Sequence, residues 1–499
     1  MIAQVDRIAP VDLRGSVRRL LDEIGPGWMM NTAYDTAWIA RLSELGEPVG
    51  ERALDWLRAH QLADGSWGAG ELRYYHDRLI CTLAAMTVLA RHGRSRDRAR
   101  LQRAQLALQT ITQGLKADPA GETVGFEMIV PILLDEARTL GVIQSSGNGS
   151  LERLSRYRTA KLNALPGGMI NRSVTVAFSA EMAGSDGLQL LDVENLQEAN
   201  GSVAHSPSAT AYFVLHVRRC ESPALEYLRQ VVADDAAPNV APFDVFERAW
   251  VLWNLALAGP VDRETLRLCQ RHLDFLEEGW QPDEGIGFAA GYTPNDGDDT
   301  GLVYEVLTHF GRSADLGAVL RYEEQDHFRC YALEANPSIS ANIHVLAALR
   351  RAGLEIQHPS VQKTIQFLRR TQTLRLFWFD KWHASPYYPT AHTVIACAGY
   401  ESSLVSDAVY WILETQNPDG SWGYYMPTAE ETAYCLQALV VWRRSGGRVS
   451  LSVLKRAAAW LAGHTEPPYP PLWIGKCLYC PISVVRSAIL SALLLARQE

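Results

Sequence analysis

The sequence predicts an all-α protein built from two helical domains. Three observations carry this prediction. Apolar residues recur at helical spacing over most of the 499 residues, period-two alternation is scarce, and one helix-turn motif occurs near both ends of the chain. Because a chain of this length exceeds a single hydrophobic core, more than one domain is expected.

The expected helices share a 3.6-residue apolar period and are separated by short loops that contain Gly, Pro or Asp. They cover residues 17–24, 53–61, 79–91, 101–115, 128–140, 208–218, 246–257, 339–351, 361–371, 431–444, 450–462 and 482–497. Short connections between such helices favour stacked helical hairpins.

The repeated motif joins a helix end to a turn that carries Trp. Residues 56–68 recur with the same spacing at 411–423, as Trp-Leu or Trp-Ile, then Gln, then Asp-Gly-Ser-Trp-Gly. A partial third copy runs from Phe367 to Trp378. In this pattern Gln reaches a free helix end, Asp-Gly makes the turn and Trp packs over it, so we expect structural staples. Copies near opposite ends of the chain indicate two helical-barrel halves.

Composition limits the classes of partner. The formal net charge of −9 argues against nucleic acid or an anionic membrane surface as partner. No apolar run reaches the roughly 18 residues of a membrane-spanning helix, and the N-terminus lacks the apolar core of a signal peptide. We expect a soluble, cytoplasmic protein. Its eight cysteines lie scattered in apolar helical segments, as buried free thiols do.

An Asp-rich stretch is the strongest chemical signal. Three carboxylates lie within four residues, at Asp296, Asp298 and Asp299. Because carboxylates so close repel one another, at least one should keep its proton well above the usual carboxyl pKa of about 4. Residues 291–295 predict a turn, and apolar residues recur at helical spacing from Leu302. The triplet is therefore expected at the start of a helix, as a Brønsted acid.

Three non-catalytic interpretations of the triplet compete. An Asp at a helix start is often only a cap. A calcium loop fits Asp296, Asp298 and Gly301, but Leu307 occupies the position where an EF-hand needs a bidentate Glu. The third is a solvated acidic turn, and only the rest of the chain can weigh against it.

Together with the Gln-x-x-Asp-Gly-Ser-Trp repeats, the triplet resembles the class II terpene cyclases, which begin cyclisation by protonating an alkene. Further matches indicate the diterpene branch, in the order that the family has them. They are Thr32-Ala33-Tyr34-Asp35-Thr36-Ala37-Trp38, His76-Asp77-Arg78-Leu79, Gly125-Phe126-Glu127, Ser206-Pro207-Ser208-Ala209-Thr210, Pro238-Asn239-Val240 and Leu472-Trp473-Ile474-Gly475-Lys476.

The resemblance implies two α-helical barrel domains, called β and γ, with γ inserted after an N-terminal helix and the active site between them. Polar loops at 44–49 and 233–242 are the candidate boundaries. We therefore assign residues 1–45 and 236–499 to the β domain, and residues 46–235 to the γ domain.

The resemblance also implies roles for individual residues. Asp298 is the expected proton donor, while Asp296 and Asp299 hold its proton and orientation. The family has an acidic Mg²⁺ and diphosphate patch just before its Gly-Phe-Glu, and Asp118 and Glu122 stand in that stretch here. Lys161 resembles a diphosphate-binding lysine of the plant relatives. For Asp118, Glu122 and Lys161 a solvated surface charge is the competing interpretation.

Carbocations need a wall that stabilises charge without reacting, and aromatic faces contribute about 0.5–2 kcal/mol each. The candidate substrate-binding rings, for which core packing is the alternative, are Tyr292, Trp378, Trp382 and Tyr388. The base that removes the last proton stays open among His383, His392 and Tyr388, since a lone His in a helical domain is often structural.

These features predict a diterpene cyclase that converts geranylgeranyl diphosphate to a bicyclic diphosphate with Mg²⁺. A rearranged halimane or clerodane skeleton, such as terpentedienyl diphosphate, is the favoured product, and copalyl diphosphate is the alternative. Asp234-Asp235 does not continue into the Asp-Asp-x-x-Asp metal site of class I synthases, so the product should keep its diphosphate, and a separate class I synthase is the expected consumer. The rivals are a non-catalytic helical-repeat scaffold and a triterpene cyclase that acts on squalene.

Overall fold

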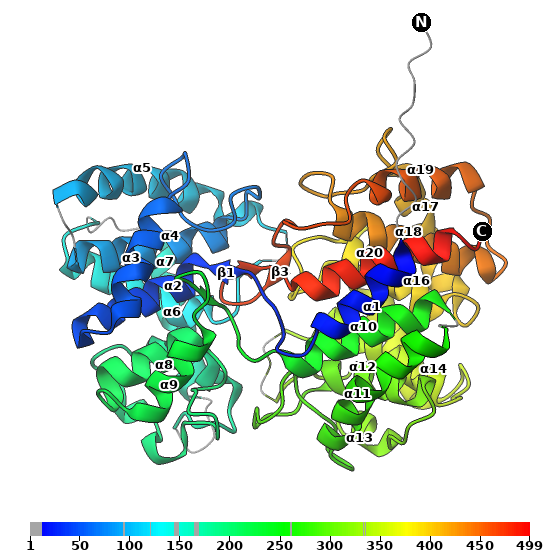
Figure 1. The fold of residues 1–499 in the computed structure, drawn as a ribbon, viewed down its shortest axis with the longest axis horizontal. Helices are drawn as coiled ribbons and strands as arrows, with labels where there is room; N and C mark the ends of the chain where they lie inside the picture. Colours follow the sequence, from blue (N-terminus) through cyan, green and yellow to red (C-terminus); the bar gives the residue numbers. More distant parts are fainter. Residues whose placement is uncertain are drawn as a thin grey trace, which may run out of the picture.

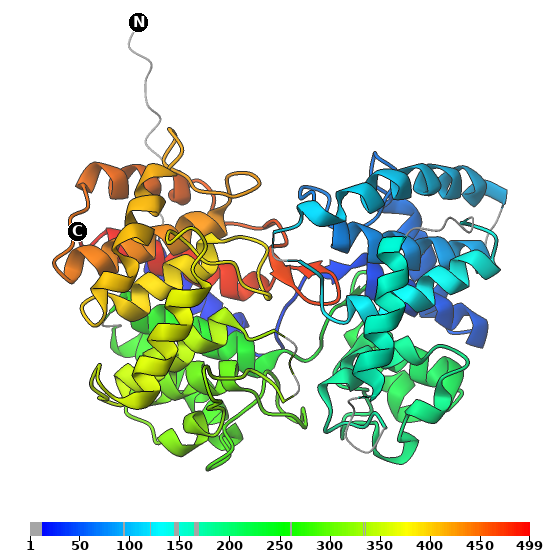
Figure 2. The same cartoon turned by 180° about the vertical axis from the view of Figure 1, so that it is seen from behind.

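The computed structural model describes residues 12–92, 95–119, 121–143, 149–163, 169–259, 262–332, 334 and 336–499. These residues form two helical lobes that meet at a waist, which Figure 1 and Figure 2 show from opposite sides. Their regular secondary structure is helical, apart from short strands of two residues each. The all-α prediction is confirmed. No described helix is both long and apolar enough to cross a lipid bilayer.

One lobe is a double ring of helices. Its inner helices pack each on the next, and the last packs back on the first: α10 (Asp244–Ala258), α12 (Gly297–His309), α14 (Ile339–Arg351), α16 (Tyr387–Cys397), α18 (Ala429–Arg444) and α20 (Ile482–Ala496). Its outer helices are α1 (Leu13–Glu23), α11 (Arg263–Gly279), α13 (Leu316–Leu320), α15 (Pro359–Thr371), α17 (Ser402–Glu414) and α19 (Leu451–Ala462). The ring is therefore completed by α1, from the other end of the chain, which packs on α11 and α20.

Burial separates the inner from the outer helices. In α18 the buried residues run without a break from Ala429 to Val440, whereas α15 buries one stripe that includes Val361, Thr364 and Leu368. A helix that is buried all round belongs inside a ring, and an amphipathic helix covers it. Because inner and outer helices alternate along the chain, the first turns of the inner helices gather at one end. That end faces the waist, since β2 (Ala237–Pro238) and β4 (Leu478–Tyr479) lead directly into α10 and α20.

The other lobe is formed around α4. Its helices are α2 (Ala33–Ala40), α3 (Pro48–Ala59), α4 (Tyr75–Arg91), α5 (Arg98–Gly114), α6 (Phe126–Thr139), α7 (Gly149–Asn163), α8 (Pro207–Tyr212) and α9 (Ser222–Val231). Every residue of α4 from His76 to Leu89 is buried, and α2, α5 and α6 pack against it. A helix that is buried on all sides in this way forms the centre of the lobe's core.

The chain enters and leaves this lobe at one place. Strand β1 (Asn31–Thr32) pairs antiparallel with β2, so that Asn31 lies opposite Pro238 and Thr32 opposite Ala237. The lobe is therefore an insertion, but it begins before residue 46, where the sequence placed the boundary. Helix α2, which had been assigned to the other domain, packs on α3, α4 and α8. The polar loop at 44–49 is thus internal to the lobe.

The Trp of each repeated motif is a staple, as expected. The indole Nε1 of Trp67, Trp378 and Trp422 donates to the backbone oxygen of Leu57, Leu368 and Ile412, at 2.8, 2.7 and 2.7 Å respectively. All three indoles are fully buried. This contact gives Trp378 a structural role in place of the substrate-binding role expected for it.

A hairpin of the ring lobe packs into the inserted lobe. Between β3 (Trp473–Ile474) and β4, its turn carries Lys476, which is fully buried. The Lys476 ammonium donates to Glu181 Oε1 at 2.6 Å and to the hydroxyls of Ser206 and Ser208 at 2.7 Å each. Asp77 Oδ1 accepts from the backbone N–H of Leu478 at 2.8 Å. Several of the motifs that carry the family resemblance therefore lock the two lobes together.

Replacing Lys476 with Met should lower the free energy of unfolding by about 3–5 kcal/mol, because the Glu181 carboxylate would stay buried without its counter-charge. Denaturant unfolding followed by circular dichroism measures this change. The matched control is Arg52→Met, which breaks a pair with Asp235 whose side chains are 54% and 50% exposed, and which should change the free energy by no more than about 0.5 kcal/mol. Equal effects of the two variants would contradict the role of the buried pair.

Candidate active site

The acid triplet lies at the start of inner helix α12, as predicted, and Asp296 is the cap of that helix. Its Oδ1 accepts hydrogen bonds from the backbone N–H groups of Asp298 and Asp299, at 3.0 and 2.8 Å, and its Oδ2 accepts from the Tyr331 hydroxyl at 3.2 Å. Burial raises the pKa of Asp296 to about 7, against these hydrogen bonds and with help from the Asp298 charge. The capping interpretation is thus correct for Asp296, and the cap fixes the position of the next two acids.

Asp298 is the most exposed of the three carboxyls. Its side chain is 20% exposed, whereas Asp296 and Asp299 are buried. One of its oxygens contacts His344 Nδ1, and the other accepts from the Ser340 hydroxyl at 3.1 Å. Burial, together with the Asp296 and Asp298 charges, raises the pKa of Asp299 well above its usual range. The Asp296 and Asp299 carboxyls can therefore retain a proton in the cluster near neutral pH.

His344 was not foreseen from the sequence. Burial, the largest single influence, lowers its pKa, but the charge and hydrogen bond of Asp298, together with the charges of Glu305 and Asp380, raise the pKa overall. Its ring lies one helical turn beyond Ser340 on α14, so both side chains reach the same carboxyl. This i, i+4 spacing is the one sequence signal that could have identified it. The sequence does not show that α14 packs on α12, so it does not connect His344 to Asp298.

Trp382 and Tyr388, two of the expected substrate-binding residues, lie close to the acid. The Trp382 indole donates to the Ser338 hydroxyl at 3.1 Å, and Ser338 lies 3.0 Å from the Ser340 hydroxyl. Burial, and then the Asp298 charge, raises the pKa of Tyr388 well above its usual range. A chain of hydroxyls thus joins the Trp382 indole to the Asp298 carboxyl.

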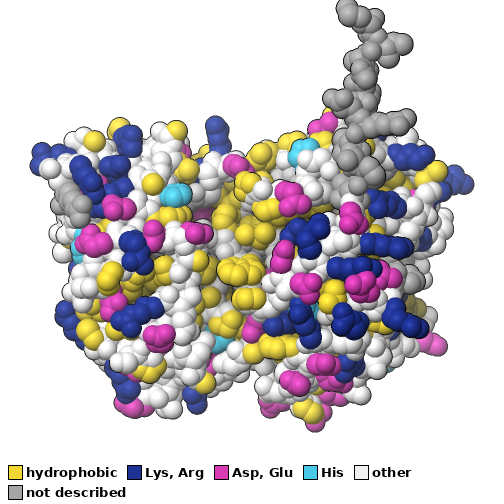
Figure 3. Space-filling view, in the orientation of Figure 1, with side chains coloured by type: hydrophobic (Ala, Val, Ile, Leu, Met, Phe, Trp, Pro, Cys, Tyr) yellow, Lys and Arg dark blue, Asp and Glu magenta, His cyan; other side chains and the backbone are white. Residues whose placement is uncertain are grey.

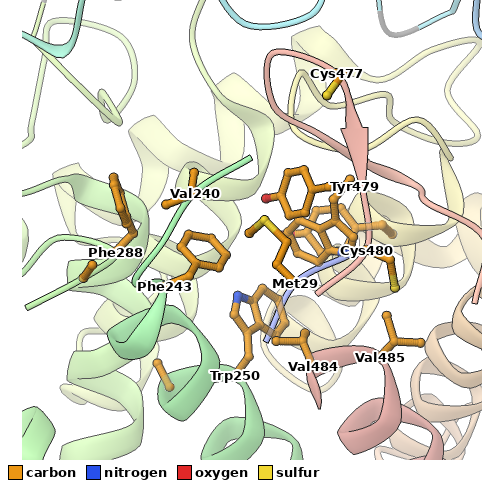
Figure 4. Packing of buried hydrophobic residues seen from close by; sticks show 14 of the residues in the cluster. Met29, Val240, Phe243, Trp250, Phe288, Cys477, Tyr479, Cys480, Val484 and Val485 are labelled. Atoms are coloured by element: carbon orange, nitrogen blue, oxygen red, sulfur yellow. The ribbon is translucent and has the colours of Figure 1, made fainter. Parts of the chain in front are cut away.

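Aromatic rings extend from the acid to the waist. Trp250 lies 5.2 Å from the His344 ring, 6.0 Å from Tyr388 and 5.8 Å from Trp473, between ring centroids. Figure 4 shows Trp250 below Phe243 and Tyr479, with Phe288 beside them. The Tyr292 ring packs at a tilt against Phe288, 4.2 Å away between centroids, so it lies at the waist end of this series. On the face in Figure 3, apolar side chains also gather along the waist between the lobes.

The candidate bases differ in what they bind. The backbone N–H of Ser385 donates to His383 Nδ1 at 3.1 Å, and His383 Nε2 lies 3.3 Å from Glu430 Oε1. Both nitrogens of His383 are therefore occupied. His392 is buried too, but neither of its ring nitrogens has a hydrogen-bond partner among the described residues.

The residues expected to hold Mg²⁺ and diphosphate separate into two groups. Asp118 is buried, and its Oδ2 accepts from the backbone N–H and Nδ1 of His76 at 2.8 and 2.7 Å, so it anchors the start of α4. Glu122 lies near Glu127, and partial burial and the Glu127 charge raise its pKa. Lys161 forms an ion pair with Glu127. Two acids and a lysine thus lie together, and Asp118 has a structural contact instead.

One compact set of potential metal ligands occurs among the described residues, and it lies elsewhere. Asp77, Cys81 and Cys477 have ligand atoms within 4.8 Å of one another. Both oxygens of Asp77 already accept backbone N–H groups, from Ala69 at 2.7 Å and Leu478 at 2.8 Å. Burial raises the pKa of both thiols, and metals bind the thiolate form. This set belongs to the contact between the lobes.

The chain is similar to several known proteins. Residues 330–441 match the squalene-hopene cyclase C-terminal domain family. The chain is 47% identical to the type B diterpene cyclase of Mycobacterium tuberculosis, over 94% of this chain and 96% of that protein. It is 30% identical to an ent-copalyl diphosphate synthase of a Streptomyces species, over 96% of each chain. The structure of ent-copalyl diphosphate synthase from Streptomyces platensis superposes with a TM-score of 0.79 at 29% identity, over 97% of this chain and 99% of that one.

The chain folds into a double ring of helices with a capped acid triplet. It is also 47% identical to a known diterpene cyclase over 94% of its length. The chain belongs to the class II diterpene cyclases. It is an enzyme, and the cyclisation that such enzymes catalyse is an isomerisation.

Proposed function

We propose that the enzyme protonates the terminal alkene of geranylgeranyl diphosphate through Asp298 and releases a bicyclic diphosphate. The observation that carries this proposal is the contact set of Asp298, whose carboxyl is held by Ser340 and His344 beside the series of aromatic rings. Protonating an alkene with a carboxylic acid is strongly unfavourable in water. The acid must therefore be kept neutral, dry and in contact with the double bond.

Different residues position the acid, stabilise its anion and stabilise the substrate cation. Asp296 fixes the acid through its cap, and the raised pKa values of Asp296 and Asp299 keep a proton in the cluster. When Asp298 gives up its proton, the Ser340 hydroxyl and the His344 ring stabilise the carboxylate that forms. Protonation turns the prenyl substrate into a carbocation. This cation is stabilised by the aromatic faces of Trp250, Tyr388 and Trp473.

Mg²⁺ is the proposed cofactor, and it would neutralise the diphosphate so that the substrate binds in a negatively charged protein. Glu122 and Glu127 fit this role, because Mg²⁺ is usually held by one or two carboxylates together with substrate phosphates. Lys161 adds a positive charge beside them. The backbone N–H of Val124 donates to Gly475 at 2.8 Å, so this loop is fixed to the hairpin that carries Trp473.

Replacing both Glu122 and Glu127 with Gln should raise the Mg²⁺ concentration that gives half-maximal activity by at least about tenfold, a loss that even a supporting residue of a metal site causes. Initial rates over a Mg²⁺ titration measure it. Glu194→Gln, which removes an exposed partner of Arg218, is the control. An unchanged Mg²⁺ dependence in the double variant would place the metal elsewhere.

The favoured product is a rearranged halimane or clerodane diphosphate, and copalyl diphosphate is the alternative. The higher identity to the type B diterpene cyclase, 47% against 30% for the ent-copalyl diphosphate synthase, supports this order. A separate synthase that ionises the retained diphosphate is the proposed consumer of the product.

Incubation with geranylgeranyl diphosphate and Mg²⁺, removal of phosphate and mass spectrometry test the proposal. A bicyclic alcohol is expected, and its skeleton decides between the rearranged and copalyl products. Unchanged geranylgeraniol would contradict the proposed substrate or reaction.

A further inference from the structure

His392 lies inside the ring of inner helices, near the acid. Its ring is T-shaped against Tyr388 at 4.6 Å and Tyr434 at 4.9 Å, and tilted against Trp250 at 5.2 Å. The His344 ring, which contacts Asp298, is 6.1 Å away. His392 therefore belongs to the same aromatic enclosure as the acid.

Within the described part of the chain, His392 lacks the hydrogen bonds that a buried polar side chain usually makes. The residue is 2% exposed, and neither nitrogen has a hydrogen-bond partner among the described residues. Nearly all buried polar side chains are hydrogen-bonded, so an exception calls for an explanation. Burial lowers the pKa of His392 well below its usual range, so the imidazole is neutral and one nitrogen carries an unused lone pair.

His383 shows what a structural histidine in this enclosure looks like. It stacks on Tyr388 at 4.8 Å, so it lies in the same set of rings. Its Nδ1 lies 3.1 Å from the backbone nitrogen and 3.2 Å from the backbone oxygen of Ser385, and its Nε2 lies 3.3 Å from Glu430 Oε1. Both nitrogens of His383 are therefore engaged. Among the described histidines, His205 also has two unpartnered ring nitrogens, but it lies at the waist against Phe288 and Tyr292, whereas His392 lies beside the acid.

We propose that His392 is the base that ends the cyclisation, an inference that rests on the proposed function. A C–H bond next to the cationic carbon breaks, its electron pair becomes the new C=C bond, and the proton moves to the free nitrogen of His392. The ring system of the product then carries one C=C bond and no positive charge, the allylic C=C bond beside the diphosphate is retained, and His392 becomes an imidazolium.

The imidazolium has a route for losing its proton. A cavity of about 310 Å³ adjoins His392 and His344 and is also lined by Glu305, Arg350 and Arg351. A cavity with charged side chains in its wall admits water. Burial and the neighbouring His344 and His383 disfavour a positive charge on His392, so the proton passes to water. The proton that Asp298 loses is likewise recovered from solvent, and the reaction is balanced.

The position of this base bears on the product. Protonation occurs next to Asp298, and each ring closure moves the positive charge away from the acid, toward the diphosphate end of the chain. A copalyl-type alkene forms where the charge then stands. Because His392 lies at the acid end, hydride and methyl shifts must first return the charge toward it. A base at His392 therefore gives a rearranged skeleton with its double bond in or near the first-formed ring.

The test compares products of wild type, His392→Phe, His392→Gln and His383→Phe from geranylgeranyl diphosphate with Mg²⁺. Phe keeps the flat ring without nitrogen lone pairs, and Gln is a polar alternative if the Phe variant does not fold, which thermal unfolding reveals. Both His392 variants should still consume substrate, because Asp298 is intact. The share of the wild-type product should fall at least about tenfold, in favour of other alkenes or alcohols formed by water capture. His383→Phe should retain the wild-type product.

Other results overturn the assignment. A folded His392 variant that makes only the wild-type product at the wild-type rate would exclude His392 as the base. So would one that leaves the substrate unconsumed, since that loss would lie in initiation. Redistribution by His383→Phe alone would transfer the role to His383. If wild type itself formed no cyclic product, the proposed function would fail first, and the base with it.

Discussion

Replacing Asp298 with Asn should lower the rate of cyclisation by about 10³-fold or more, a loss within the range of a positioned general acid. The amide has nearly the shape of the carboxyl and can keep the contacts with Ser340 and His344, but it has no acidic proton. Substrate consumption measured by mass spectrometry at saturating geranylgeranyl diphosphate gives the effect. Binding should change little, so the loss should appear in kcat.

The matched control for this variant is Asp262→Asn. Asp262 caps outer helix α11 by accepting from the backbone N–H of Thr265 at 3.0 Å, and Asn is an equally good cap. Its activity should equal that of wild type. If Asp298→Asn kept wild-type activity, another group would be the acid, and the exposure of Asp298 would have no bearing on catalysis.

The second large effect is expected at His344. His344→Phe should lower kcat by about 10- to 100-fold, because the Asp298 carboxylate that forms in the reaction would lose a charge-assisted hydrogen bond worth about 1.5–3 kcal/mol. The Michaelis constant should change less than kcat, since the contact matters most after proton transfer. Steady-state kinetics with geranylgeranyl diphosphate separate the two constants.

His272 provides the control for this second variant. It is buried in the same lobe, and its Nε2 lies 2.8 Å from the backbone oxygen of Leu21, far along the chain from the acid. His272→Phe should affect stability but not kcat of the folded protein. Equal losses of kcat in the two variants would show that His344 acts only through packing.

The position of the acid triplet at a helix start could be predicted from the sequence because its signal is local. Asp296, Asp298 and Asp299 are adjacent along the chain, and the cap that orients them is made by their own backbone N–H groups. The partners of Asp298 could not be predicted in this way. Ser340 and His344 reach it only because α14 packs beside α12, and no period in either helix specifies that neighbour.

Among the helices, too, some could be predicted from the local sequence and others could not. Helix α14 begins and ends at the predicted residues. Helix α11 was missed, although it has a capping Asp262 and one apolar stripe. Helix α16 was missed, because it is buried almost all round and contains Pro389, so it has no amphipathic pattern. The domain boundary at residue 45 was misplaced for a related reason. A polar loop marks a surface turn equally well within a domain and between domains.

Two expected site residues have structural contacts. Trp378 makes the same staple contact as Trp67 and Trp422, as the partial third copy of the motif had indicated. Asp118 binds His76 within the inserted lobe rather than facing solvent. The residue type of Asp118 did not specify this partner, which is determined by tertiary packing.

The most direct test of the account is to run the reaction of the wild-type enzyme in D₂O. If a carboxylic acid of the protein protonates the terminal alkene, the cyclic product carries one deuterium, on the ring carbon derived from the CH of that alkene, and it keeps its diphosphate. A product without deuterium at that carbon, or with loss of diphosphate in place of protonation, would contradict protonation by the Asp296, Asp298 and Asp299 cluster as the first step.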